Sequence, residues 1–407
     1  MEEKRNVPNL RFPGFTDSWE QRRLGEIGSV AMCKRVYKNQ TTEAGDVPFF
    51  KIGTFGGEPD AFISNELFEK YRELYSFPKV GDILISAAGT IGRTIVYQGE
   101  RAYYQDSNIV WLNHDERLDN SFFLQYLNNQ TWSSLEGSTL KRLYNKDILD
   151  ANIALPKPDE QHRIGALFRK LDSLIALHQR KLDHVKELKK GLLQKMFPKE
   201  GANVPELRFP GFTDPWEQRR LGELMDITSV KRVHQDDWSS EGIRFLRARD
   251  LVAFSNGEEI DEPLFISEEL YEEYSSLSGK AVENDLLVTG VGTIGVPWRV
   301  PSSEPIYFKD GNIIWFKNMN VIDGLFFYYS FTSSSIQDFI RKSAGSGTVG
   351  TFTIDTGKKT PIQLPSIDEQ AQIGGFFQRL DSLIALHQRE LDHVKELKKG
   401  LLQQMFV

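Results

Sequence analysis

The chain has 407 residues, of which 40% are hydrophobic and 26% are charged, and its formal net charge is −7. This length allows two or three domains with buried cores, and no apolar run approaches the roughly 20 residues that a membrane-spanning helix needs. The single cysteine, Cys33, excludes an intramolecular disulfide framework, and the acidic balance argues against a protein that coats nucleic acid unaided. We therefore expect a cytoplasmic globular protein.

Each half of the chain opens with nearly the same segment. Residues 8–27 read PNLRFPGFTDSWEQRRLGEI, and residues 205–224 read PELRFPGFTDPWEQRRLGEL. Large aromatic side chains flanked by arginine and glutamine favour an anchor that packs the chain onto a domain. We name these segments the opening repeats and predict a structural role for them, with a partner surface as the alternative.

A diverged but related region follows each opening repeat. Residues 81–92 (GDILISAAGTIG) match residues 284–295 (NDLLVTGVGTIG), and residues 105–112 (QDSNIVWL) match residues 309–316 (KDGNIIWF). Short β-branched runs bounded by turns predict strands, and the segments NSFFLQYL and GLFFYYSF predict a short helix. Each half is therefore predicted to hold one α/β unit.

The GTIG loop occurs once in each of these regions. Its two glycines allow a tight loop whose backbone can approach a phosphate, although an ordinary turn after a strand would explain a single copy. Recurrence in two diverged regions raises the weight of a functional role. The residues concerned are Gly89, Thr90, Gly92, Gly292, Thr293 and Gly295.

A long helix is predicted to close each half. The 27 residues at 171–197 recur at 380–406 with changes only at Lys181/Glu390 and Lys195/Gln404. Apolar positions step by four and three in turn, the period of a coiled coil. The predicted seam residues are Ile164, Phe168, Leu171, Ile175, His178, Leu182, Val185, Ile373, Phe377, Leu380, Ile384, His387, Leu391 and Val394.

From Glu160 to Met196 the first helix would be roughly 55 Å long. The order unit, helix, unit, helix predicts that the two helices pair antiparallel with a unit at each end, a pseudo-twofold dumbbell. A polar residue at a seam usually fixes register, so His178 and His387 are interpreted as structural, with a pH switch as the alternative.

Sequence motifs of catalysis are missing. The chain has no G-x-x-x-x-G-K-[ST] loop, no H-E-x-x-H helix and no G-x-S-x-G elbow, which would signal a nucleotide-binding loop, a zinc protease and a hydrolase. We predict neither catalytic residues nor a metal site.

The doubled set of motifs resembles the specificity subunits of type I restriction-modification enzymes. The LRFPGF…WE…LGE opening, the GDILI…GTIG core, the LP…DEQ..I helix start and the coiled-coil segment each occur twice in register. The resemblance implies two α/β (α+β) target recognition domains in tandem, each reading half of a split site in double-stranded DNA. It also implies that the helices set the spacing and bind two methylation subunits, and that two restriction subunits join the full complex.

The resemblance assigns chemistry to the partners and boundaries to this chain. S-adenosylmethionine, ATP and Mg would act in partner subunits, and this chain would carry no cofactor. The predicted domains are residues 1–154 and 199–363 for recognition, the latter with the linker, and residues 155–198 and 364–407 for the helices. The alternative is a coiled-coil scaffold with two ligand-binding domains; a self-sufficient methyltransferase would need an N-P-P-[YF] loop, which the sequence lacks.

Basic and amide side chains beside turns of the two units are the predicted DNA contacts, because Arg and Lys suit phosphates and guanine while Asn and Gln suit adenine. A solvated surface is the alternative for any single cluster. The predicted phosphate contacts are Lys34, Arg35, Arg93, Lys141, Arg142, Lys231 and Arg232. The predicted base contacts are Gln105, Asn108, Arg299 and Asn312.

Overall fold

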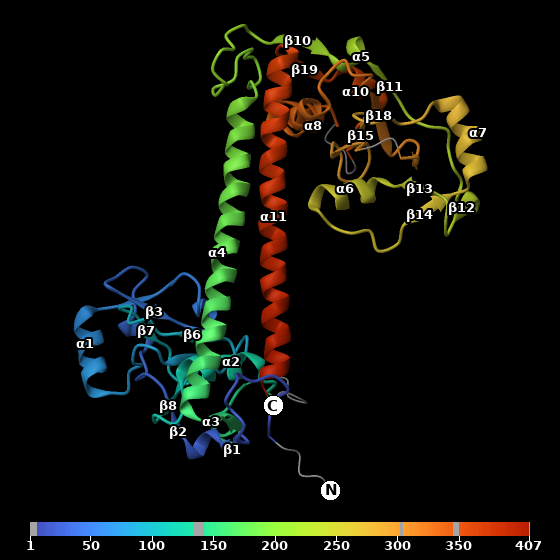
Figure 1. Ribbon diagram of the computed structural model, residues 1–407. Helices are drawn as coiled ribbons and strands as arrows, with labels where there is room; N and C mark the ends of the chain where they lie inside the picture. Colours follow the sequence, from blue (N-terminus) through green and yellow to red (C-terminus); the bar gives the residue numbers. More distant parts are fainter. Residues whose placement is uncertain (1–5, 133–141, 302–303, 345–349, 407) are drawn as a thin grey trace. The chain divides into compact units, whose positions relative to one another are not determined.

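The computed structural model describes residues 6–132, 142–301, 304–344 and 350–406. It consists of two compact units, shown in Figure 1: unit 1 is Met1–Gln179 with Arg389–Val407, and unit 2 is Arg180–Gln388. The division falls inside both long helices. Each unit therefore combines one α/β region with one half of each long helix.

Unit 1 holds three small sheets, with strand orders β1-β9, β2-β8-β5-β6 and β4-β3-β7. Its elements are β1 (Glu20–Arg23), β2 (Gly28–Ala31), β3 (Val47–Phe50), β4 (Phe62–Ile63), α1 (Asn65–Leu74), β5 (Ile83–Ser86), β6 (Thr94–Val96), β7 (Tyr103–Tyr104), β8 (Ile109–His114), α2 (Asn120–Asn129), α3 (Asn145–Leu149) and β9 (Asn152–Leu155). All pairs are antiparallel except β3 with β7.

Unit 2 repeats this plan with strand orders β10-β19, β11-β18-β15-β16 and β12-β14-β13-β17. Its elements are β10 (Glu217–Arg220), α5 (Leu221–Leu224), β11 (Asp226–Thr228), β12 (Trp238–Ser239), β13 (Ile243–Leu246), α6 (Ala248–Asn256), β14 (Leu264–Ile266), α7 (Glu268–Ser278), β15 (Leu286–Thr289), β16 (Pro297–Arg299), β17 (Ile306–Phe308), β18 (Ile313–Lys317), α8 (Gly324–Thr332), α9 (Ser334–Ser343), α10 (Ile354–Lys359) and β19 (Pro361–Leu364). The strands and short helices predicted from sequence are confirmed in both units.

Equivalent caps start equivalent helices in the two units. The Asp119 carboxylate accepts from the first amides of α2, and the Asp323 carboxylate does the same for α8. The hydroxyls of Ser64 and Ser267 cap α1 and α7 in the same way. Such caps satisfy amides that have no partner inside the helix, so the diverged sequences keep the same helix starts.

The two long helices are α4 (Pro158–Met196) and α11 (Ile367–Met405), as predicted. In unit 1 the Phe168 ring lies 6.0 Å from Phe406, and Lys398 pairs with Asp172 at 2.6 Å. Asp172 comes after Phe168 in the chain, whereas its partner Lys398 comes before Phe406, so the two segments run in opposite directions. The helix halves in unit 1 therefore run antiparallel.

Unit 2 pairs the remaining helix halves by the same contacts. Lys189 lies 2.5 Å from Asp381, and the Phe197 and Phe377 rings are 6.0 Å apart. These contacts again place the end of α4 beside the start of α11. The coiled-coil register and the dumbbell arrangement stay predictions.

The opening repeats join the two long helices. In unit 1 the Arg11 guanidinium donates to both carboxylate oxygens of Glu160, at 2.9 and 2.7 Å, near the start of α4. The Leu10 amide donates to the Gln404 carbonyl at 2.9 Å, near the end of α11. Trp19 of the same repeat is buried as well, so the predicted anchoring role is confirmed.

The second opening repeat makes the same contacts in unit 2. Arg208 donates to both oxygens of Glu369 at 2.7 and 2.8 Å, and the Leu207 amide donates to the Lys195 carbonyl at 2.9 Å. Trp216 is buried like its counterpart. Repeated segments thus contact repeated segments, which accounts for their near-identity.

Glycine lets the short helices lie directly against the long ones. A Cβ on Gly165 of α4 would lie 2.0 Å from the Ser121 hydroxyl of α2, and a Cβ on Gly374 of α11 would lie 2.7 Å from the Leu325 Cβ of α8. Larger residues at either position would push the helices apart. None of the helices in the described ranges is long and apolar enough to cross a membrane.

Candidate nucleic-acid interface

A loop that links two sheets holds an exposed arginine in each unit. In unit 1 the Arg35 Nε donates to the Asp106 carboxylate at 2.8 Å, and in unit 2 the Arg232 Nε donates to Asp310 at 3.0 Å. The Asp106 carboxylate raises the pKa of the Arg35 guanidinium. The arginine side chains are 59% and 67% exposed while the aspartates are 15% and 17% exposed, so the carboxylate orients a guanidinium whose terminal nitrogens face solvent.

The backbone of the lysine before each arginine accepts an equivalent hydrogen bond in both units. Tyr103 Oη donates to the Lys34 carbonyl at 3.0 Å, and Tyr307 Oη donates to the Lys231 carbonyl at 2.9 Å. Burial raises the pKa of both phenols, so they stay protonated donors. The Lys34 ammonium lies 4.8 Å from the ring centre of Tyr75. Two predicted phosphate contacts of each unit are thus held by the same pair of hydrogen bonds.

Unit 1 gathers further predicted residues around residues 105–108. Arg142 Nη2 donates to the Ser107 carbonyl at 2.9 Å, and the Asn108 carbonyl accepts from the Ala87 amide at 2.7 Å. The Gln105 side-chain oxygen accepts from the Ile52 amide at 2.9 Å, which gives this side chain a structural bond as well.

Arg93 directly follows the GTIG loop and adds to this surface. Its Nη2 donates to the Gly56 carbonyl at 3.2 Å, and its side chain is exposed. The structure thus brings Arg35, Arg142 and Arg93 to one set of neighbouring loops. Lys141 lies outside the described residues.

Unit 2 keeps the frame of this surface and changes its side chains. Val296 follows the second GTIG loop where Arg93 follows the first, and Lys309 stands in place of Gln105. Phe352 bonds Gly290 as Leu143 bonds Ala87, so the residue before it, Thr351, takes the place of Arg142. The two units therefore present different groups on equivalent loops.

The two predicted base contacts of unit 2 each take part in a hydrogen bond within the protein. Arg299 Nη1 donates to the Asn284 side chain at 2.8 Å, and its side chain is half-buried on β16. The Asn312 carbonyl accepts from the Gly290 amide at 2.7 Å, which leaves its side-chain amide uncommitted by that bond. Base reading by these residues stays a prediction.

A hydroxyl at the end of the preceding strand shapes each GTIG loop. The Arg93 amide donates to Ser86 Oγ at 2.9 Å in unit 1, and the Val296 amide donates to Thr289 Oγ1 at 2.9 Å in unit 2. Both hydroxyls are buried and donate to the carbonyl of the loop threonine. The loop glycines Gly89, Gly92, Gly292 and Gly295 have φ between 65° and 79°.

These φ values lie in the left-handed region, which only glycine adopts without strain. Thr90 and Thr293 are exposed at the tips. Both loops therefore present backbone to solvent at equivalent places, which is compatible with the predicted phosphate approach.

Burial on the long helices follows the predicted seam. Ile164, Phe168, Leu171, Leu182, Ile373, Phe377, Leu380 and Leu391 are buried, and the other six seam residues are half-buried. By contrast, Leu174 and Leu177 of α4 are 42% and 38% exposed, and Leu383 and Leu386 of α11 are 43% and 42% exposed. Apolar side chains thus occupy both the seam and an outer row.

His178 contacts a position whose charge differs between the two copies of the repeated helix segment. Its Nδ1 lies 3.1 Å from the Glu390 carboxylate in unit 1. Lys181 stands at the position of Glu390 in the other copy. This contact agrees with a register-fixing role for His178 and leaves the pH switch as a prediction.

Sequence reasoning missed the acidic and strained residues of the turns. Asp106 and Asp310 orient the arginines, and Ser107 has a φ of 54° where its counterpart, Gly311, has 68°. A serine in the left-handed region carries strain of a kind found at binding sites. The matching segments QDSN and KDGN contained the signal for these residues. Lys309, the first residue of the second segment, was also missed as a candidate DNA contact.

Comparison with known proteins gives a consistent result. The sequence model of the family described as "Type I restriction modification DNA specificity domain" matches residues 16–187 and again residues 213–396. Among curated relatives, a putative type I restriction enzyme specificity subunit, S.HindORF215P of Haemophilus influenzae, is 53% identical over 152 residues, which is 37% of this chain and 40% of that protein.

A second curated relative matches over more of the chain. The type I restriction enzyme MjaVIII specificity subunit of Methanocaldococcus jannaschii is 24% identical over 344 residues, 81% of this chain and 76% of that protein. The solved S subunit of a type I restriction-modification system from M. genitalium is 16% identical and has a TM-score of 0.65, over 98% of this chain and 99% of that one. That structural likeness shows the shared fold.

Proposed function

Because the chain belongs to the family of type I restriction-modification DNA specificity domains, we propose that it directs such a complex to a split, asymmetric DNA target. Each unit would read one half of the target. The observation that carries this proposal is the pair of equivalent loop frames that present different side chains: Arg93 against Val296, Arg142 against Thr351, and Gln105 against Lys309. Equivalent frames dock on the duplex alike, and different side chains select different bases.

Contacts to the DNA backbone would come from the groups that the two units share. Arg35 and Arg232 are fixed by their aspartates and exposed at their terminal nitrogens, a geometry suited to phosphate oxygens or to guanine. Base selection would then fall to Asn108 and Asn312 and to the positions that differ. The shared lysines and the GTIG loops would add backbone contacts.

The long helices are proposed to set the spacer and to bind two methylation subunits. Unit 1 exposes Leu174 and Leu177, and unit 2 exposes the equivalent Leu383 and Leu386, in segments that are almost identical. Two like surfaces suit two copies of one partner. Partners that supply basic surface would also explain how an acidic chain takes part in DNA binding.

In this proposal the chemistry belongs to the partners. S-adenosylmethionine would act in the methylation subunits, and ATP and Mg in the two restriction subunits. This chain would contribute recognition and geometry without a catalytic group.

The test is to map methylation in DNA exposed to the chain together with its methylation subunits. We expect every methylated site to contain two different short sequences at a fixed separation. A complex lacking this chain, run beside it, should methylate none of those sites. A complex that assembles and methylates without sequence preference would instead support the scaffold alternative.

A further inference from the structure

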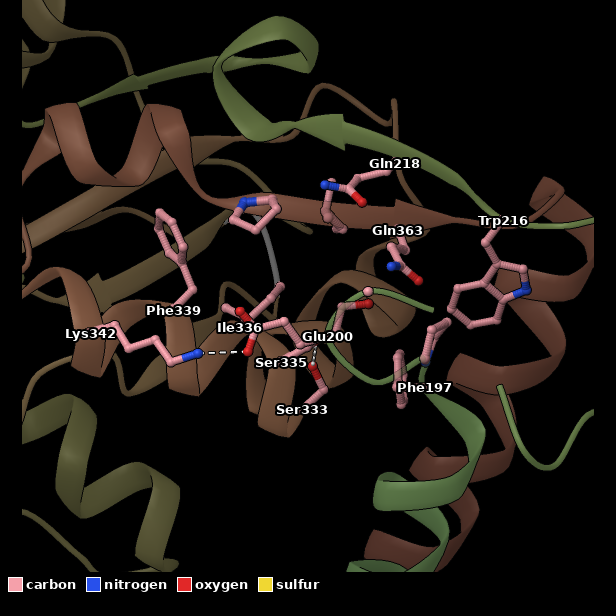
Figure 2. A pocket seen from close by; sticks show the side chains of 15 residues that line it. Phe197, Glu200, Trp216, Gln218, Ser333, Ser335, Ile336, Phe339, Lys342 and Gln363 are labelled. Atoms are coloured by element: carbon pink, nitrogen blue, oxygen red, sulfur yellow. Dashed lines mark hydrogen bonds and ion pairs between the residues drawn. The ribbon is translucent and has the colours of Figure 1, made fainter. Parts of the chain in front are cut away.

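Unit 2 has a cavity of about 120 Å³ beside its two-stranded sheet, drawn in Figure 2. Gln218 of β10 and Gln363 of β19 lie on one side of it, and Ile336 of α9 lies on the other. The aromatic rings of Phe197 and Trp216 close one end. The cavity thus combines apolar walls with a polar strand edge.

Three buried polar atoms in this lining have no hydrogen-bond partner among the described residues. They are the Ser330 hydroxyl, in a residue only 3% exposed, the side-chain oxygen of Gln363, and the indole nitrogen of Trp216, which is equally unpaired in the equivalent Trp19 of unit 1. Most buried polar atoms in proteins are paired, and an unpaired one needs a reason. A bound polar group is such a reason.

Unit 1 fills the equivalent place with its own side chain. Ser330 stands seven residues after the cap Asp323 of α8, and Tyr126 stands seven residues after the equivalent cap Asp119 of α2. The Tyr126 hydroxyl donates to the Asn152 carbonyl at 2.9 Å, at the start of β9. Burial raises the pKa of this phenol to about 12, so it remains a donor.

The strands beneath these two side chains correspond residue by residue. Gln21 pairs with Ala154 in unit 1, and Gln218 pairs with Gln363 in unit 2. Pro361, which lines the cavity, has the place of Asn152. Unit 2 therefore has a serine and a cavity over the strand position where unit 1 has a phenol ring.

From this correspondence we propose that the cavity of unit 2 binds a p-hydroxyphenyl group, either a small phenolic compound or a tyrosine side chain of a partner. This site goes beyond the DNA-targeting role. At about 120 Å³ the cavity is of the same order as, though smaller than, an engineered cavity of about 150 Å³ that binds benzene. The ring would pack against Phe197 and Trp216, and its hydroxyl would donate to the unpaired Gln363 oxygen.

The direct test titrates the full chain with p-cresol, the analogue of a tyrosine side chain, and follows binding by NMR or calorimetry. We expect one saturable site with a dissociation constant on the order of millimolar, as suits so small a ligand. N-acetyltyrosinamide separates the two sources. If it also binds, the site accepts tyrosine in a peptide; if only p-cresol binds, the site takes free phenols.

Two matched variants decide whether the cavity is the site. Ser330→Tyr supplies the ring from the chain itself and should weaken p-cresol binding at least tenfold without lowering the melting temperature. Tyr126→Ser opens the equivalent place in unit 1, where Ala154 stands in place of Gln363 and the Asn152 carbonyl is the available acceptor, and should raise the stoichiometry from one ligand to two. As a third variant, Gln363→Leu should remove the preference for p-cresol over toluene.

Two outcomes would overturn the proposal. One is the absence of saturable p-cresol binding to the unaltered chain. The other is equal binding by the Ser330→Tyr and Gln363→Leu variants and the unaltered chain, which would place the ligand elsewhere. Should Ser330→Tyr not fold, Gln363→Leu alone decides between these results.

Discussion

Replacing Arg35 by alanine should lower the DNA affinity of the assembled complex, and the difference in affinity from the unaltered complex should become smaller as the salt concentration is raised. Arg35 is 59% exposed, and only its Nε is committed to Asp106, so both terminal nitrogens can meet a phosphate. A charge-assisted bond of this kind contributes about tenfold or more in affinity at low salt. Neutralising one phosphate contributes about 0.9 to the slope of log affinity against log salt.

These values fix the size of the effect. Between about 50 and about 200 mM salt, one lost phosphate contact changes the affinity ratio of parent to variant by about 3.5-fold. A tenfold loss at the lower salt should therefore become about threefold at the higher. Fluorescence anisotropy with a short duplex, recorded at several salt concentrations, measures both numbers, and DNA with an altered half-site should show the same loss.

Arg232→Ala tests the equivalent arginine of unit 2, and the double variant should lose about twice as much slope. Arg72→Ala is the control, since Arg72 is an exposed arginine of unit 1 that contacts Glu69 of its own helix. If the slope of Arg35→Ala equals that of the unaltered complex, Arg35 does not contact phosphate. A loss restricted to one half-site sequence would assign it to base reading instead.

Four further outcomes can be checked. Exchanging residues 28–154 for the same region of a relative should change one half of the methylated sequence and keep the other, and a change in both halves would contradict independent reading. Inserting four residues after Lys186 adds about 6 Å of helix and should lengthen the unread spacer by one or two base pairs, whereas two residues turn the helix by about 200° and should abolish assembly. Glu369→Gln removes the carboxylate that pairs with the nearly buried guanidinium of Arg208, and it should lower the free energy of unfolding, measured in urea, by about 3–5 kcal/mol. Glu160→Gln should have the same effect in unit 1. A decrease below about 1 kcal/mol would refute this. Burial raises the pKa of Cys33 to about 12 from 9.0, so near pH 8 its thiol should react roughly a thousandfold more slowly in the folded chain than in denatured protein, and equal rates by a thiol-reactive dye would show that it is accessible.

Local patterns predicted the parts of the fold that depend on neighbours in sequence. The seam from Ile164 to Val185 follows the period of a helix that buries one face, and burial in the structure follows it. The LP…DEQ..I motif predicted a helix start, and α11 begins at Ile367 within it, where the Ser366 hydroxyl accepts from the Glu369 amide at 3.4 Å. Such signals are strong because a helix repeats one contact pattern over many turns.

The parts that the sequence left hidden depend on residues far apart in the chain. Arg35 finds Asp106 across 71 positions, and Arg11 finds Glu160 across 149. No spacing rule links such partners, since tertiary packing alone brings them together. For the same reason the candidate arginines could be named from composition, whereas the aspartates that orient them could not.

The two units differ in how much of the chain must be synthesised before the hydrophobic core of each can be completed. Phe406 packs against Trp19, Phe122 and Phe168, so unit 1 needs residues from both ends of the sequence, while unit 2 is one continuous stretch. A ribosome delivers the N-terminal residues first. Unit 1, although translated first, must wait with an incomplete core until translation has passed Phe406, and during that interval its uncovered aromatic side chains are candidate sites for chaperone binding.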